Sequence, residues 1–153
     1  MILEIKIPVL PVVKAYLRHK YPVEPFELYR NNKYGIFLFN SLTLLRPVVG
    51  KVEFHEKYSE TLRLQITERI WGRQGLHIHP KKVIDFNNLV LYTLDEDFCN
   101  WMDVCSTMVG GKIQDHYFAF RENYGLHEDL FTLKCMEKKY ERYRKRVKMA
   151  LSA

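Results

Sequence analysis

Two segments in the first half of the chain alternate apolar and polar residues, as a β-strand with one buried face does. In residues 2–7, ILEIKI, the apolar positions of one side are Leu3, Ile5 and Ile7. In residues 62–68, LRLQITE, the corresponding positions are Leu62, Leu64 and Ile66. Both segments are predicted to be strands that cover a core with one face and meet solvent with the other.

The chain between these strands carries signals for a short helix and for a hairpin. Pro11 suits the first turn of a helix, and apolar residues follow it at helical spacing in VVKAYLRHKY. Two short apolar runs, FELY and YGIFLF, flank the turn-rich sequence RNNK. Runs that are joined by such a turn predict a β-hairpin over residues 26–39.

After residue 79 the apolar residues recur every three or four positions, which is the period of a helix. A long helix is predicted from about Val83 to Met108, and Gly110 and Gly111 are expected to stop it. A second helix is predicted over residues 113–124 and is expected to end at Gly125. Its buried side chains are predicted to be Ile113, Tyr117 and Phe120.

The last helix is predicted to begin at Thr132, a residue type that caps helix N-termini well. It carries one narrow apolar stripe at spacings of three and four, made of Leu133, Met136, Tyr140, Tyr143 and Val147. We expect this stripe to pack on the preceding helix, which would direct the charged residues to solvent. The two tyrosines are therefore assigned to packing and not to stacking on nucleobases.

These elements predict a single α+β domain over residues 1–153. Its first half, residues 1–79, is expected to hold a small mixed antiparallel sheet with one short helix. Its second half, residues 80–153, is expected to hold three helices and to end in a basic one. A chain of 153 residues with 47% hydrophobic residues is long and apolar enough for one core.

The positive charge of the chain is concentrated in the last predicted helix. The chain has a net charge of +6, and residues 134–148, with eight basic and two acidic side chains, carry all of it. The remaining sequence has 16 basic and 16 acidic side chains. Charge clustered in this way is typical of a surface that meets a polyanion. The candidate nucleic-acid-binding residues are Lys134, Lys138, Lys139, Arg142, Arg144, Lys145, Arg146 and Lys148.

The sequence therefore favours a small DNA-binding protein whose last helix contacts the phosphates of duplex DNA. About five or six of the basic residues can reach phosphates from one helix face, and such contacts position a protein without reading sequence. The alternative is a non-catalytic structural or interaction module, which docks on an acidic protein surface or forms a homo-oligomer. A helix that is simply solvated is the third interpretation left open.

A resemblance is carried by FNNLV at residues 86–90 and by YGLHEDLFTLKCMEKKYERYRKR at residues 124–146. These sequences resemble small uncharacterised proteins of bacterial mobile elements and prophages, and the two closing helices resemble a helix-turn-helix. The resemblance covers the last third of the chain. It departs in the link GLHEDLF, which at seven residues exceeds the usual turn of three or four. The resemblance implies a regulator or accessory factor of a mobile element or phage.

The remaining polar residues do not form a catalytic or metal-binding pattern. His77 and His79 lack a third ligand at a recognisable spacing, and His116 and His127 lack a neighbouring nucleophile, so surface or hydrogen-bonded positions are expected for them. The acidic residues 95–97 and 103 are expected to be solvated. The sequence also lacks the glycine motifs of phosphate-binding loops and nucleophile elbows. We therefore expect that the protein is not an enzyme and that it binds no metal and no cofactor.

Cysteine usage and hydropathy predict a cytoplasmic protein without a membrane span. Cys99, Cys105 and Cys135 are odd in number and have no metal-type spacing, so they are expected to be reduced thiols. The N-terminal sequence MILEIKIPVLP lacks the basic region of a signal peptide, and no apolar run approaches the ~20 residues that cross a bilayer. The aromatic residues expected at the surface are Tyr29, Tyr34 and Tyr58.

Overall fold

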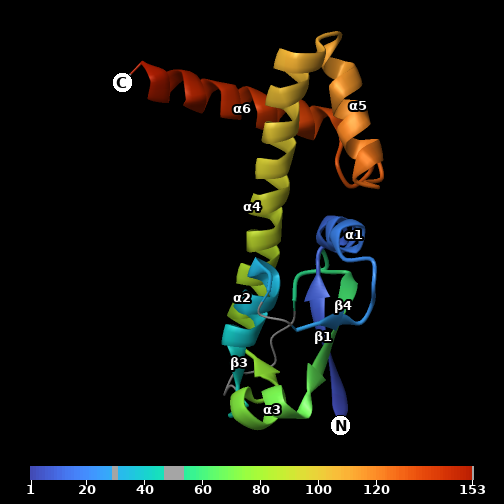
Figure 1. Cartoon of the computed structure of the whole chain (residues 1–153), viewed down its shortest axis with the longest axis vertical. Helices are drawn as coiled ribbons and strands as arrows, with labels where there is room; N and C mark the ends of the chain where they lie inside the picture. The colour runs from blue at the N-terminus through green and yellow to red at the C-terminus, as the bar shows by residue number, and fades with distance from the viewer. Residues whose placement is uncertain (29–30, 47–53, 153) are drawn as a thin grey trace. The chain divides into compact units, whose positions relative to one another are not determined.

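A computed structural model describes residues 1–28, 31–46 and 54–152 (Figure 1). The chain forms two compact units, Met1–Leu91 and Tyr92–Ala153. Sheets and helices both occur in the first unit, whereas helices make up the described part of the second. The last strand ends at Ile78 and the long helix α4 (Pro80–Val104) follows it. The expected α+β class is confirmed.

The main sheet of the first unit is built on the two predicted strands. Strand β1 (Ile2–Val9) pairs antiparallel with β4 (Glu60–Thr67), with Ile2 opposite Thr67 and Val9 opposite Glu60. The short strand β2 (Phe26–Glu27) pairs parallel with β4 on its other side, which gives the order β1-β4-β2. A second sheet joins β3 (Leu42–Thr43) to β5 (His77–Ile78) in antiparallel orientation.

One face of the main sheet is buried because its apolar residues alternate as predicted. Along β4, the side chains of Leu62, Leu64 and Ile66 are all at most 5% exposed. On β1, burial increases toward the C-terminal end, where Ile7 and Val9 are buried. The period-two pattern therefore predicted both the strands and the face that covers the core.

The described part of residues 1–79 contains three α-helices where one was expected, so this prediction was wrong. Helix α1 (Pro11–Lys20) has Pro11 in its first turn, as predicted. Helices α2 (Lys33–Ser41) and α3 (Glu68–Gln74) were not predicted. In place of the second strand of a hairpin, residues 34–39 form part of α2.

The start of α2 explains why the hairpin prediction failed. The Asn32 side chain accepts a hydrogen bond from the Gly35 amide at 2.8 Å, so it caps a helix and does not close a turn. Tyr34 and Leu38, one helical turn apart, are then both buried. The Tyr34 ring lies 6.3 Å from the ring of Phe86 on α4, so the expectation of an exposed Tyr34 was wrong. Tyr58 is half-buried, and Tyr29 lies outside the described residues.

The second unit contains the C-terminal part of α4, helix α5 (Ile113–Asn123) and helix α6 (Leu133–Leu151). The prediction of three helices is inexact, because α4 continues into a π-helical turn, Cys105–Val109, before Gly110 ends it. The core of this unit is aromatic. The ring of Phe98 on α4 lies 5.2–6.4 Å from the rings of Tyr117, Phe120, Phe131 and Tyr140.

Two side chains of α5 depart from expectation. Ile113 was predicted to be buried but is 42% exposed, whereas Tyr117 and Phe120 are buried as predicted. His116 was expected at the surface or in a hydrogen bond. It is buried, and within the described ranges its Nε2 atom has no hydrogen-bond partner.

None of the described helices is long and apolar enough to cross a lipid bilayer.

Candidate nucleic-acid interface

Helix α6 begins where the sequence predicts. The Thr132 hydroxyl oxygen accepts a hydrogen bond from the Cys135 amide at 3.2 Å, which satisfies one of the free N–H groups of the first turn. The link from α5 spans residues 124–132, which is longer than a helix-turn-helix turn. From Leu133 the helix continues to Leu151, so it contains all eight candidate basic residues.

The apolar stripe of α6 is buried in its first half and exposed in its second. Met136 is fully buried and Tyr140 is 5% exposed, while Tyr143 is half-buried and Val147 is 39% exposed. The Tyr140 ring lies 6.5 Å from that of Tyr117 on α5 and also faces Phe98 on α4. The stripe therefore packs on both helices and not on α5 alone, and its C-terminal end is uncovered.

A carboxylate on α4 fixes the two tyrosines of this stripe. The Asp103 carboxylate accepts hydrogen bonds from the Tyr140 hydroxyl at 3.1 Å and from the Tyr143 hydroxyl at 2.5 Å. The bond to Asp103 raises the pKa of Tyr143 to about 12, because ionisation would place two negative charges side by side. Burial is the main cause of the raised pKa of Tyr140. Asp103 thus binds the middle of α6 to α4.

A second carboxylate on α4 binds one of the eight basic residues. The Lys139 Nζ atom lies 2.8 Å from Oδ1 and 2.9 Å from Oδ2 of Asp95. Both side chains are partly exposed, so the ion pair contributes modestly to stability, on the order of 1 kcal/mol or less. Lys139 is therefore an anchor of α6, and the expectation that Asp95 and Asp103 are merely solvated was wrong.

Sequence patterns missed these two anchors because their partners are 37 to 44 positions away. A signal was nevertheless present. Asp95 and Asp103 lie four residues before and after Cys99, so all three share one helix face. Cys99 is buried, and burial raises the pKa of its thiol to about 11. Two carboxylates beside a buried position predict polar partners from another element.

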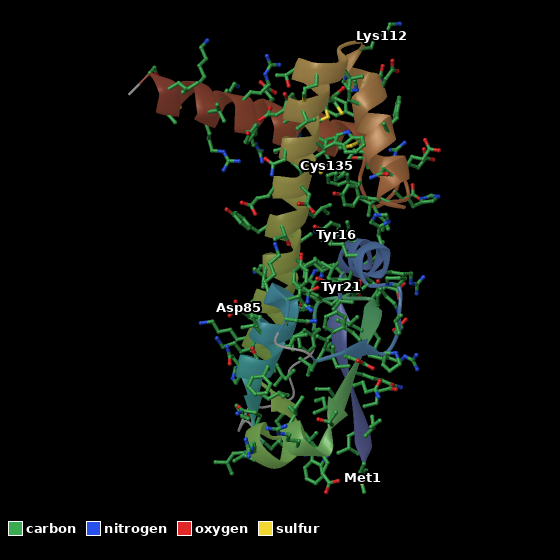
Figure 2. The ribbon with its side chains drawn as sticks, in the orientation of Figure 1. Met1, Tyr16, Tyr21, Asp85, Lys112 and Cys135 are labelled. Atoms are coloured by element: carbon green, nitrogen blue, oxygen red, sulfur yellow. The ribbon has the colours of Figure 1, made fainter. Side chains whose placement is uncertain are left out.

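The other seven candidate basic residues are exposed. With about 100° between successive residues of a helix, four of them fall within about 80° of arc on the side opposite the buried stripe. A fifth, Arg146, lies on the flank next to this arc. We call these five the basic face of α6: Lys134, Lys138, Arg142, Lys145 and Arg146. Many side chains of α6 in Figure 2 extend away from the ribbon and end in nitrogen.

Few carboxylates neutralise the basic face. Glu141 pairs with Lys145 at 3.0 Å, and the hydrogen bond from Lys145 lowers the pKa of Glu141. Among the described residues, no carboxylate lies within ion-pair distance of Lys138, Arg142 or Arg146. These three follow one another at four-residue spacing, where like charges repel by a few tenths of a kcal/mol per pair. An anion bound along this face would relieve the repulsion.

The two remaining exposed candidates, Arg144 and Lys148, have different surroundings from the basic face. The guanidinium of Arg144 lies 5.6 Å from the centre of the Tyr140 ring, a cation–π distance. Arg144 and Lys148 also line a groove of about 650 Å³ between α6 and the start of α5, together with apolar side chains such as Val147. Lys145 of the basic face lies at the border of this groove. This flank is mixed in character, whereas the basic face is cationic.

Two of the four histidines singled out in the sequence, His79 and His127, form hydrogen bonds to nearby main-chain groups. The Nδ1 atom of His79 accepts a hydrogen bond from the Lys81 amide at 3.1 Å, at the start of α4. The Nδ1 atom of His127 accepts one from the Asp129 amide at 3.3 Å, in the link before α6. Across the described ranges, no group of three or more His, Cys, Asp or Glu side chains is arranged to hold a metal ion.

Comparison with known proteins finds no match for this chain among protein-family models, curated proteins or solved structures. A function for the chain must therefore rest on the geometry and charge of α6.

Proposed function

We propose that the chain is a small DNA-binding protein whose helix α6 contacts the phosphates of duplex DNA. The observation that carries this proposal is the division of α6 into two sides. One side is held by Met136, Tyr140 and the anchors to Asp95 and Asp103. The other side is the exposed basic face, which no aromatic or carboxylate cluster covers in the described residues.

The length of the basic face suits a duplex. Lys134 and Arg146 are 12 residues apart, which corresponds to about 18 Å along the helix. Over both strands, B-DNA carries a charge every ~1.7 Å along its axis, so several phosphates on the facing side of the duplex lie within that length. The basic side chains of this face can therefore contact several phosphates at once.

The proposed contacts are mainly independent of sequence. Lys and Arg contacts to phosphates set the position of a protein on DNA, and base contacts set its specificity. Arginine has a planar donor group that can form two bonds to guanine, so the two arginines of the basic face, Arg142 and Arg146, are the candidates for any base preference. This behaviour fits a cytoplasmic regulator or accessory factor of a mobile element or phage, as the resemblance of the last third implies.

The proposal is tested with a variant in which four residues of the basic face become glutamine: Lys138→Gln, Arg142→Gln, Lys145→Gln and Arg146→Gln. The affinity for a fluorescently labelled duplex is measured by anisotropy at low salt. We expect a loss of at least about tenfold, because several phosphate contacts are removed at once. Far-UV circular dichroism of the same variant checks that α6 remains folded.

The matched control removes the same charge from the first unit. Four of the exposed basic residues of that unit are changed to glutamine: Lys57, Arg69, Arg73 and Lys81. Both variants then have the same net charge, and only the location differs. The proposal fails if the basic-face variant binds DNA as tightly as the unchanged protein, or if the control loses as much affinity.

A second candidate function is an interaction module, and the uncovered end of the apolar stripe favours it. Val147 is 39% exposed and Leu151 is 83% exposed, beside the groove described above. Changing both to aspartate would weaken a protein–protein contact at this end but leave the basic face intact. Loss of self-association or of partner binding in this variant, without any DNA affinity in the unchanged protein, would favour the second function.

A further inference from the structure

Strand β1 is an edge of the main sheet, with β4 on one side only. It is eight residues long and can be followed in Figure 2 from the labelled Met1. Strand β2 covers the opposite edge of β4. The open side of β1 is therefore the longest strand edge in the described part of this sheet.

Two hydrogen bonds from Asn87 identify the main-chain groups on that open side. The buried Asn87 side chain on α4 accepts from the Leu10 amide at 2.9 Å and donates to the Pro8 carbonyl at 3.2 Å. In an antiparallel strand, the N–H and C=O of every second residue point to the same side. The groups of Glu4 and Lys6 therefore also point away from β4. Pro8 lies on this side, where its missing N–H removes no bond to β4.

The outward main-chain groups of β1 are hydrogen-bonded at its C-terminal end and unbonded nearer its N-terminus. Asn87 satisfies the edge at Pro8 and Leu10, as a neighbouring strand would. Within the described ranges, no group bonds the outward N–H and C=O of Glu4 and Lys6. Both side chains are exposed. Unpaired strand edges of this kind are templates for another strand.

Lys6 also lacks a partner for its charge. It stands directly opposite Arg63 on β4, and like charges in that position destabilise a strand pair. Arg63 faces Glu4 at 3.8 Å and Glu24 at 3.6 Å. No carboxylate in the described residues lies within ion-pair distance of Lys6. A carboxylate supplied from the open side would satisfy it.

We propose that two copies of this chain pair antiparallel through the open side of β1, about a two-fold axis at Ile5. Glu4 of each copy then stands opposite Lys6 of the other, because their positions are symmetric about residue 5. Each of these two pairs exchanges two main-chain hydrogen bonds, since the outward groups of both residues face the partner. The two three-stranded sheets become one continuous sheet.

The sequence of β1 favours a second copy over an unrelated strand. Its two exposed charges are opposite in sign and equidistant from Ile5, so the strand is complementary to itself in one orientation only. Parallel pairing in register would place Glu4 beside Glu4 and Lys6 beside Lys6. The half-buried Leu3 and Ile5 lie on the other face and gain apolar neighbours in the pair. The contact is short, so association is expected to be weak and dependent on concentration.

The test is sedimentation equilibrium of the full chain without nucleic acid. The unchanged protein is expected to show a monomer–dimer equilibrium. Glu4→Lys places like charges opposite each other in both pairs, and so does Lys6→Glu, so each variant alone should dimerise at least tenfold more weakly. An equal mixture of the two variants should recover the dimer, since one copy then carries two lysines and the other two glutamates.

A third variant tests the main-chain bonds. Lys6→Pro removes an outward N–H without removing a bond to β4, so it should abolish the dimer while the far-UV circular dichroism of the monomer is retained. The proposal is overturned if the unchanged protein is monomeric throughout, if each charge reversal leaves dimerisation unchanged, or if the mixture fails to recover the dimer. None of these residues belongs to α6, so the result is independent of the DNA-binding test.

Discussion

The Asp103 carboxylate accepts hydrogen bonds from the hydroxyls of two tyrosines on neighbouring turns of α6. An ionised carboxylate accepts stronger hydrogen bonds than a neutral oxygen does, because it carries a full negative charge. The arrangement orders Tyr140 and Tyr143 in a stacked pair, with ring centres 6.1 Å apart and planes at 19°. Together with the Lys139–Asp95 pair and the buried Met136, Asp103 therefore fixes which side of α6 faces α4 and which side carries the basic face.

Tyr143→Phe tests this contact through its pH dependence. The folded pKa of Tyr143 is about 12, above the unfolded value of about 10, so the bond stabilises the folded state fully below pH ~10. That contribution is lost as the pH rises toward 12. We expect the variant to be less stable by about 1 kcal/mol near neutral pH, the net contribution typical of one hydrogen bond. The difference from the unchanged protein should shrink above pH ~10.

Urea unfolding at a series of pH values measures this difference. Tyr92→Phe is the matched control, because Tyr92 is 63% exposed and its substitution removes the same hydroxyl group. A stability difference for Tyr143→Phe that stays constant from neutral pH to pH ~12 would contradict the assigned role of Asp103.

Helices and strands were predicted most accurately where the apolar residues follow one clear period, of two for a strand or of three to four for a helix. The alternation in residues 62–68 and the three-to-four spacing after residue 83 gave β4 and α4 together with their buried faces. The run YGIFLF is short and apolar on all sides, so period alone does not separate a strand from a helix. The Asn32 cap and the packing of Tyr34 on Phe86 stabilise the helix in this segment. The second of these is a contact across 52 positions, which no local pattern contains.

Gly75, between α3 and β5, lies against the main chain of Thr43 on β3. Its φ is +91°, and an added Cβ would overlap the carbonyl of Thr43 on β3. Gly110 has φ +71° but open space around the same position, so Gly110→Ala introduces backbone strain alone, about 1–3 kcal/mol. Gly75→Ala should destabilise the protein by at least about 1–3 kcal/mol more, the cost typical of overpacking. Urea unfolding of the two variants measures the difference, and equal losses would show that the fit against β3 is unimportant.

At the scale of the whole molecule, charge is the feature that sequence alone located. The excess of +6 lies on one helix, and that helix forms over the residues expected. The division of its residues into anchors and exposed side chains could not be predicted. Lys139 and Arg142 are both cations in the sequence, and only the position of Asp95 makes Lys139 an anchor. With Lys139 as an anchor and with Arg144 and Lys148 beside the groove, five of the eight candidates remain on the basic face.

The salt dependence of duplex binding shows whether the basic face of α6 contacts phosphates. Affinity is measured against salt concentration for the unchanged protein and for the variant with Lys138, Arg142, Lys145 and Arg146 changed to glutamine. Five phosphate contacts predict a log–log slope of about −4 to −5, and loss of four contacts predicts about −1. Equal slopes for the two proteins, or no measurable affinity of the unchanged protein at low salt, would contradict the assignment of α6 as a DNA-binding helix.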